Sequence, residues 1–286
     1  MQPHNKKIAF FGTPPFTVSF LDALAGAGYS PSLIVTTPDR PVGRGLVLTA
    51  PEPKQWALKH GVRVFQPETI DDTCVSNLAQ EPWDLFIVVA YGKVLPETLI
   101  TTPTHGTINV HYSLLPKYRG ATPVESAILN GDTMTGVCIQ QMRFKLDTGP
   151  IIATREVSIT PSDTTAMLRE RLNTEALTML PDTVEKLFSG TITAHEQDDS
   201  QATRCTKISK EDGEISLSDD PIMLDRKFRA YSPWPGLFFF TMRGGKNIRI
   251  KITDAHLENG RFVISTVIPE SGKPMSWDEF QRWHTF

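Results

Sequence analysis

Cysteine is scarce in this sequence, with only Cys74, Cys138 and Cys205 among 286 residues. The number is odd and the three lie far apart, so neither a disulfide framework nor a zinc-ligand spacing is present. No stretch reaches the ~20 apolar residues of a membrane-spanning helix, and no apolar leader precedes the first strand-like segment. We therefore expect a cytoplasmic protein that binds no metal and does not contact a membrane.

A strong charge of one sign is also absent. There are 29 Lys and Arg against 32 Asp and Glu, a formal net charge of −3. This argues against nucleic-acid binding through overall charge but leaves local basic patches open. Hydrophobic residues make up 40% of the chain and charged residues 21%, which is typical of a globular protein and not of a disordered chain. The length suits one large domain or two unequal ones.

Apolar segments alternate with helical patterns up to about residue 190. Strands are predicted at 8–11, 33–35, 85–90, 107–110, 136–142 and 151–159, and helices at 15–25, 54–59 and 163–187. The segment 36–49, rich in Pro, Gly and Arg, is expected to be a loop. Another helix is expected to begin at Pro123, with Thr122 and Glu125 forming a capping box. The alternation favours an α/β fold with an open, mostly parallel, Rossmann-like sheet.

The pattern changes near residue 190. Residues 248–252 alternate between Ile and polar residues, as a half-buried strand does, and a second strand is expected at 261–267. A helix is expected at 222–230, and a capping box at 276–279 opens a terminal helix. The predicted division is an α/β domain at 1–190, a linker at 191–210 and a smaller, mainly β domain at 211–286.

Asn109 and His111 stand two residues apart at the end of a predicted strand. Residues i and i+2 of a strand share a face, so an amide and an imidazole are expected to converge at the sheet edge where open α/β sheets bind ligands. Each has an ordinary alternative, because Asn often forms turns and a lone His is usually a satisfied surface or core residue. Asp147, within a Leu-Asp-Thr-Gly segment, is by itself typical of a turn.

Motifs along the chain favour a catalytic role for these residues over the ordinary alternatives. Residues 109–120 read NVHYSLLPKYRG, and LDTG follows at 146–149. The pattern resembles the tetrahydrofolate-dependent formyltransferases. Further segments that match this family are FGTP at 11–14, PDRPVGRG at 38–45, VVAYG at 88–92, KISKEDG at 207–213 and RAYSPWPG at 229–236. Together these segments are spread across most of the chain up to Gly236.

The resemblance implies transfer of a formyl group from the co-substrate 10-formyltetrahydrofolate to the α-amino group of methionine on the initiator tRNA, in translation initiation. Asn109 would donate a hydrogen bond to the formyl oxygen, a contact worth ~3–4 kcal/mol in other acyl transfers. His111 would take a proton from the amine. Asp147 would orient His111 and stabilise its charged form, or relay protons through a water. Residues 1–190 would then be the catalytic domain.

The resemblance also implies binding surfaces. Residues expected to contact the folate are Ala90, Tyr91, Gly92, Leu95, Pro96, Ser113, Leu114, Leu115 and Pro116. Core packing is the alternative for the two leucines. Residues expected to contact the tRNA backbone are Arg40, Arg44, Arg249 and Lys251. The alternatives are a solvated charged loop for the first two and an edge strand protected by charge for the others.

Other functions within and outside the family stay open. Formyltransferases acting on an amino-sugar nucleotide share the Asn-His-Asp centre but are not expected to carry the Arg-Gly loop at 40–45. A catalytically retired folate- or RNA-binding module is disfavoured by the intact centre. Tyr112 stands where the family has a small residue, so the pocket is expected to differ there. The family's C-terminal barrel is longer than this one, which predicts an incomplete OB-like barrel that a homodimer could close.

Overall fold

The computed structural model describes residues 6–43 and 45–283. Its contacts divide the chain into two compact units with interleaved segments. The first unit comprises Met1–Arg119, Gly136–Glu156 and Leu172–Thr203, and the second Gly120–Thr135, Val157–Arg171 and Arg204–Phe286. The predicted boundaries at 190 and 210 stay predictions. No helix in the described part of the chain is long and apolar enough to cross a bilayer.

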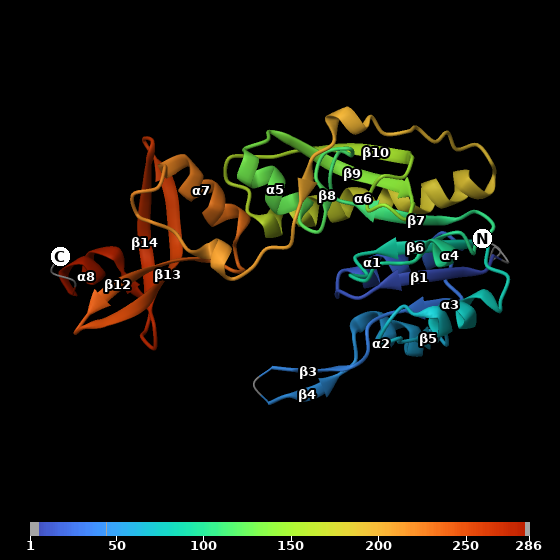
Figure 1. The fold of residues 1–286 in the computed structure, drawn as a ribbon, viewed down its shortest axis with the longest axis horizontal. Coiled ribbons are helices and arrows are strands. Elements are labelled where there is room, and N and C mark those ends of the chain that lie inside the picture. Colours follow the sequence, from blue (N-terminus) through green and yellow to red (C-terminus); the bar gives the residue numbers. More distant parts are fainter. Residues whose placement is uncertain (1–5, 44, 284–286) are drawn as a thin grey trace. The chain divides into compact units, whose positions relative to one another are not determined.

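A seven-stranded sheet organises the first unit (Figure 1). Its strands are β1 (Ile8–Gly12), β2 (Leu33–Val35), β5 (Arg63–Phe65), β6 (Leu85–Val89), β7 (Thr107–His111), β9 (Met134–Gln141) and β10 (Ile151–Ser158). The order is β10-β9-β7-β6-β1-β2-β5. Pairings among β5, β2, β1, β6 and β7 are parallel, whereas β9 pairs antiparallel with β7. The predicted mostly parallel α/β fold is confirmed.

Apolar composition explains why these strands occupy the centre. Every residue of β1, β2 and β6 is buried, as in a parallel sheet covered on both faces. The helices in the α/β part of the chain are α1 (Thr17–Gly26), α2 (Glu52–Lys59), α3 (Asp72–Ala79), α4 (Glu97–Ile100) and α6 (Thr165–Phe188). Three of them, α1, α2 and α6, were predicted. Strand β5 and helices α3 and α4 were not, since they are short and carry little periodic signal.

Successive strands are added first on one side of β1 and then on its other side. Strands β2 and β5 lie on one side of β1, and β6 and β7 on the other, so β1 and β6 form a topological switch point, where open sheets bind ligands. Gly12 pairs with Val89, and Val88 pairs with Asn109. The ends of β1, β6 and β7 therefore share one edge, to which β7 contributes Asn109 and His111.

The expectation of a loop at 36–49 is wrong. The segment forms a β-hairpin from β3 (Arg40–Val42) and β4 (Val47–Thr49), which extends away from the sheet (Figure 1). Asp39 fixes its base by accepting hydrogen bonds from Gln66 Nε2 at 2.8 Å and Lys54 Nζ at 2.8 Å. These bonds hold the pKa of the Asp39 carboxyl below its usual value. Both strands have only three residues, too few for a recognisable alternation.

The second unit holds a small antiparallel sheet, as predicted. Its strands β12 (Leu237–Arg243), β13 (Lys246–Glu258), β14 (Arg261–Pro269) and β15 (Met275–Ser276) pair in chain order. Helices α5 (Pro123–Asn130), α7 (Pro221–Ala230) and α8 (Trp277–Trp283) belong to the same unit. One face of the sheet is covered by α8, because the Phe239 ring lies 6.1 Å from that of Trp277 and 6.0 Å from that of Phe280.

Two predicted helix starts have different outcomes. The capping box at α8 is confirmed, since Ser276 N donates to Glu279 Oε2 at 3.0 Å and Glu279 N donates to Ser276 Oγ at 3.2 Å. The capping box at α5 is wrong. Thr122 is the N-cap residue, but its hydroxyl donates to the Thr206 carbonyl at 2.6 Å, and Glu125 accepts from Arg169 at 2.5 Å. Tertiary partners here replace the local ones.

Candidate active site

The antiparallel neighbour of β7 determines what surrounds Asn109 and His111. Asn109 pairs with Gln140 and His111 pairs with Cys138. Paired residues of adjacent strands project from the same face of the sheet, so these four side chains share one face at the edge. Asn109 is half-buried, and its side chain makes no hydrogen bond with any residue that the structure describes. Its amide can therefore donate to a ligand.

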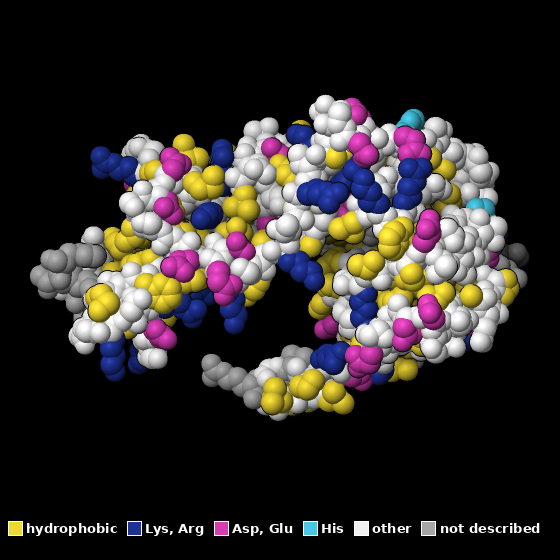
Figure 2. All heavy atoms as spheres, viewed as in Figure 1, with side chains coloured by type: hydrophobic (Ala, Val, Ile, Leu, Met, Phe, Trp, Pro, Cys, Tyr) yellow, Lys and Arg dark blue, Asp and Glu magenta, His cyan; other side chains and the backbone are white. Residues whose placement is uncertain are grey.

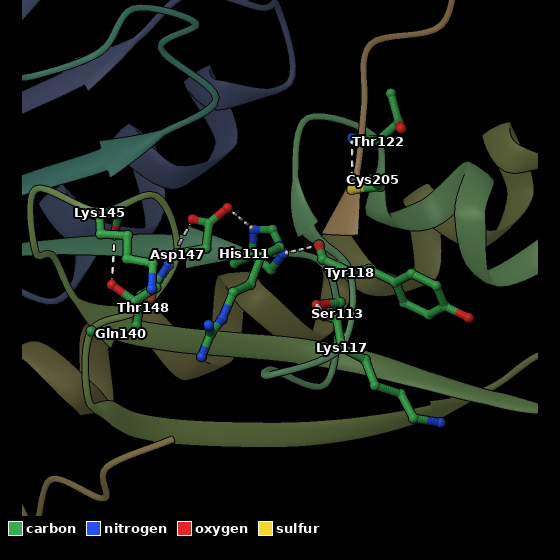
Figure 3. Close-up of polar contacts among 12 residues, drawn as sticks. His111, Ser113, Lys117, Tyr118, Thr122, Gln140, Lys145, Asp147, Thr148 and Cys205 are labelled. Carbon is green, nitrogen blue, oxygen red and sulfur yellow. Dashed lines mark hydrogen bonds and ion pairs between the residues drawn. The ribbon is translucent and has the colours of Figure 1, made fainter. Parts of the chain in front are cut away.

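The His111 ring is buried, with a relative side-chain exposure of 6%, and held from two sides (Figure 3). Its Nε2 lies 3.0 Å from the carbonyl oxygen of Tyr118. A carbonyl only accepts, so Nε2 carries the proton in the neutral ring and Nδ1 keeps its lone pair. Nδ1 faces Asp147 Oδ2 at 3.8 Å, which is an ion-pair distance and exceeds a direct hydrogen bond. His111 thus presents a basic nitrogen toward a carboxylate.

Asp147 sits in a constrained turn. Its backbone φ is +53°, a conformation that costs ~1–3 kcal/mol outside glycine and persists only when neighbours enforce it. Gln140 Nε2 donates to Asp147 Oδ1 at 2.8 Å, and Thr148 Oγ1 donates to the Lys145 carbonyl at 2.8 Å. A Cβ on Gly149 would overlap the carbonyl oxygen of Gln141. The glycine therefore lets the turn lie against β9.

Gln140 is a site residue that the sequence reading missed. It is 1% exposed and anchors the carboxylate that faces His111. A signal was available, because Gln140 follows Val137, Cys138 and Ile139 in a strand with an otherwise buried centre. A buried polar side chain in such a strand needs a partner.

The residues predicted to contact folate surround the switch-point edge in two groups. Ala90 and Gly92 follow β6 and are exposed, with positive φ values of 49° and 82°. The Tyr91 ring instead packs in the core, edge-on to Phe11 at 5.5 Å, and burial raises the pKa of its hydroxyl. Leu95 is buried and Pro96 half-buried. The Tyr91 ring is therefore part of the core and is not placed to meet a ligand.

The second group is the loop after β7. Ser113 and Leu115 are buried, whereas Leu114 and Pro116 are half-buried. The Ser113 hydroxyl donates to the Lys117 carbonyl at 2.6 Å, so it shapes the loop from inside. Core packing, the alternative weighed for the two leucines, fits Leu115 better than Leu114.

The residues predicted to contact tRNA fall in both units. In the first unit, Arg40 is exposed and pairs with Glu68 at 2.7 Å; Arg44 lies outside the described residues. In the second unit, Arg249 and Lys251 are exposed, whereas Ile250 and Ile252 between and beyond them are buried. The predicted alternation of β13 is confirmed, and it gives this face of the sheet two cations.

An open α/β sheet with an amide, an imidazole and a carboxylate at its switch-point edge is suited to acyl-type group transfer. Residues 6–184 match the family model described as formyl transferase, and residues 207–268 match the model of the formyl transferase C-terminal domain. The chain belongs to the formyl transferase family, which confirms the resemblance seen in the motifs.

Relatives and solved structures agree with this membership. The methionyl-tRNA formyltransferase of Neisseria meningitidis is 38% identical over 89% of this chain and 83% of its own length. That of Methylococcus capsulatus is 42% identical over 80% of this chain and 75% of its own. The crystal structure of an N-formyltransferase from Helicobacter canadensis, with folinic acid and dTDP-3-aminofucose, has a TM-score of 0.65 at 16% identity, covering 91% and 95%. At that identity the likeness shows the fold alone.

Proposed function

We propose that this protein transfers the formyl group of 10-formyltetrahydrofolate to the α-amino group of methionyl initiator tRNA, in the cytoplasm, where translation begins. The observation that carries the proposal is the His111–Asp147 pair, held beside Asn109 in a chain whose relatives at 38% and 42% identity are methionyl-tRNA formyltransferases. Fold similarity to a sugar N-formyltransferase gives no separate support for an amino-sugar acceptor.

The residues proposed to bind the folate have features that suit a pterin. Pterin recognition needs an apolar slot together with backbone donors and acceptors. The exposed residues Ala90 and Gly92 lie at the edge where β6 ends, and the half-buried Leu114 and Pro116 offer apolar surface. The bound co-substrate supplies the formyl carbon on a nitrogen that can leave as an amine.

Proton transfer and charge stabilisation fall to this chain's own residues. The attacking amine forms a bond to the formyl carbon while the bond from that carbon to the folate nitrogen breaks. His111 Nδ1 takes a proton from the attacking nitrogen and returns it to the departing one, so no net proton is consumed. Asp147, 3.8 Å away, stabilises the charged imidazole between these steps. The free Asn109 amide donates to the formyl oxygen as negative charge develops there.

The direct test measures formyl transfer from 10-formyltetrahydrofolate to methionyl-tRNA and, in parallel, to an amino-sugar nucleotide. His111→Ala should lower kcat by about 10²–10⁴-fold, and Asn109→Ala by about 10²–10³-fold. Circular dichroism would check that both variants keep the fold. Preference of the wild-type protein for the sugar acceptor, or near-normal turnover by His111→Ala, would overturn the proposal.

The proposed tRNA contacts are Arg40 and Arg44 in the first unit and, separately, Arg249 and Lys251 on β13 in the second. On β12, Phe238 pairs with Lys251 and Phe240 with Arg249, so aromatic and cationic side chains alternate on one face. The Arg249 guanidinium lies 5.3 Å from the centre of the Phe238 ring. Phe238 is buried beneath these cations, whereas the Phe240 ring is exposed. Cations that contact phosphates and an exposed ring that stacks on a base make such a face suited to RNA.

A homodimer is the further partner we propose. Strands β12 and β15 are the two ends of the four-stranded sheet, and an end strand offers backbone groups for pairing with a second copy. Sedimentation equilibrium tests this: a single species at the 31.9 kDa mass of one chain at micromolar concentration would exclude the dimer.

A further inference from the structure

The segment predicted as a linker contains a side chain that bridges the two halves of the candidate centre. Gln197 Nε2 donates to the Asp147 carbonyl at 2.9 Å and to the Gly149 carbonyl at 2.7 Å. Its Oε1 accepts from Arg119 through Nε at 3.0 Å and Nη2 at 2.8 Å. The Gln197 side chain therefore forms hydrogen bonds through both its amide nitrogen and its carbonyl oxygen.

Arg119 carries this connection to His111. It follows Tyr118, whose carbonyl oxygen holds His111 Nε2 at 3.0 Å. The Arg119 side chain is 5% exposed, and its second partner is the exposed Asp199 at 2.7 Å. The backbone of this turn is tied to the same segment, since Tyr118 N donates to Thr203 Oγ1 at 2.8 Å. Gln197, Asp199 and Thr203 thus connect the turn that holds His111 with the turn that holds Asp147.

We infer that Gln197 and Arg119 are positioning residues that fix the distance between His111 Nδ1 and Asp147. The Asp147 turn is in a conformation that its neighbours must enforce, and Gln140 restrains only its carboxylate. Gln197 restrains the backbone on both sides of Thr148. Positional errors near 1 Å at a reacting group can cost about 100-fold in rate, so loss of this restraint should lower kcat without removing any group that touches the substrates.

This inference rests on the proposed function, and the variants separate the two. Gln197→Met keeps the length of the side chain and removes both polar ends. Gln197→Glu keeps an acceptor for Arg119 but has no hydrogen to donate to the two carbonyls. Gln201→Met is the matched control, because Gln201 is exposed and its amide contacts only Ser200 Oγ, at 3.5 Å, among the described residues.

Steady-state formyl transfer to methionyl-tRNA should show kcat lowered about 10- to 100-fold in Gln197→Met and Gln197→Glu, with KM for both substrates within about twofold. The control should match the wild type. In an Asp147→Asn background, Gln197→Met should lower the residual rate less than twofold, because the restraint acts through that carboxylate. A purely structural role would instead lower the unfolding temperature and leave kcat unchanged.

Wild-type kcat in Gln197→Glu, or a full additional loss in the Asp147→Asn background, would overturn the inference while leaving the proposed function intact. If Gln197→Met does not fold, Gln197→Glu still decides, since it retains the partner of the buried Arg119 side chain. If the wild-type protein transfers no formyl group, the proposed function itself fails, so wild-type activity is measured before that of any variant.

Discussion

Backbone atoms, more than side chains, set the chemistry that His111 can perform. The Tyr118 carbonyl takes the Nε2 hydrogen at 3.0 Å, and this leaves Nδ1 as the basic atom. A histidine two residues after Asn109 is visible in the sequence, but which of its nitrogens is basic is not. That choice depends on a turn seven residues further along, closed in part by Thr203.

The close packing of the Asp147 turn against β9 can be tested by adding a single methyl group at Gly149. A Cβ there would overlap the Gln141 carbonyl oxygen, so Gly149→Ala must push the Asp147 turn away from β9. We expect unfolding free energy to fall by about 1–3 kcal/mol and kcat to fall by at least about tenfold. Urea unfolding and formyl transfer measure the two effects.

Gly26→Ala is the control for that substitution. Gly26 lies in α1, and a Cβ there meets nothing within 4 Å. Alanine in a helix should leave the protein as stable or more stable, by up to about 1 kcal/mol, with unchanged activity. Equal losses in the two variants would mean that the close approach at Gly149 has no special role.

The connection into α6 depends on an ion pair between a buried carboxylate, Asp163, and the partly exposed Arg171. The Asp163 side chain is 1% exposed and accepts hydrogen bonds from Arg171 and from Thr160 N. Burial alone would raise the pKa of the Asp163 carboxyl, but these bonds outweigh it and lower the pKa below its usual value. A carboxylate with a lowered pKa in the folded state stabilises the protein above its unfolded-state value, near 3.9. That stabilisation is lost as pH falls through the folded-state value.

Asp163→Asn should therefore cost about 1–3 kcal/mol of unfolding free energy at pH 7. The difference between wild type and variant should shrink as the pH falls below about 4. Urea titrations between pH 7 and pH 3 measure this. Asp182→Asn is the control, since Asp182 pairs with Lys186 on the surface of the same helix and should change stability by less than about 1 kcal/mol. A pH-independent difference at Asp163 would contradict the assignment.

Long or strongly apolar elements could be predicted from sequence, and short or exposed ones could not. Strand β6 is apolar on both faces, and residues 248–252 of β13 alternate between apolar and polar, so both strands were found. The hairpin β3–β4 was read as a loop, because its sequence is rich in Pro, Gly and Arg and its strands have only three residues each. Its residues Leu46, Val47 and Leu48 are exposed, and Figure 2 shows hydrophobic side chains on the surface of the hairpin. At the site, Asn109, His111 and Asp147 came from motifs. Gln140 and Gln197 did not, since their roles arise from strand register and from contacts across 50 residues of chain.

The residues proposed to contact tRNA are divided between the two units. Each carries cations of its own, Arg40 in the first and Arg249 with Lys251 in the second. The net charge of −3 means that binding must depend on these local groups. Binding through phosphates releases counterions, so the observed affinity falls with salt at about 0.7–0.9 log units per log unit of salt for each contact.

Arg249→Ala and Lys251→Ala should each weaken tRNA binding and reduce the slope of log affinity against log salt by about one. Filter binding or fluorescence anisotropy between 50 and 200 mM salt, the range over which such slopes are large, measures both. Arg261→Ala is the matched control, because Arg261 is an exposed arginine at the Asn259-Gly260 turn of the same sheet. KM for the folate should not change in any of the three, since none lies in the first unit. Unaltered slopes in the first two variants would remove this face from the tRNA site and leave the hairpin as its remaining candidate.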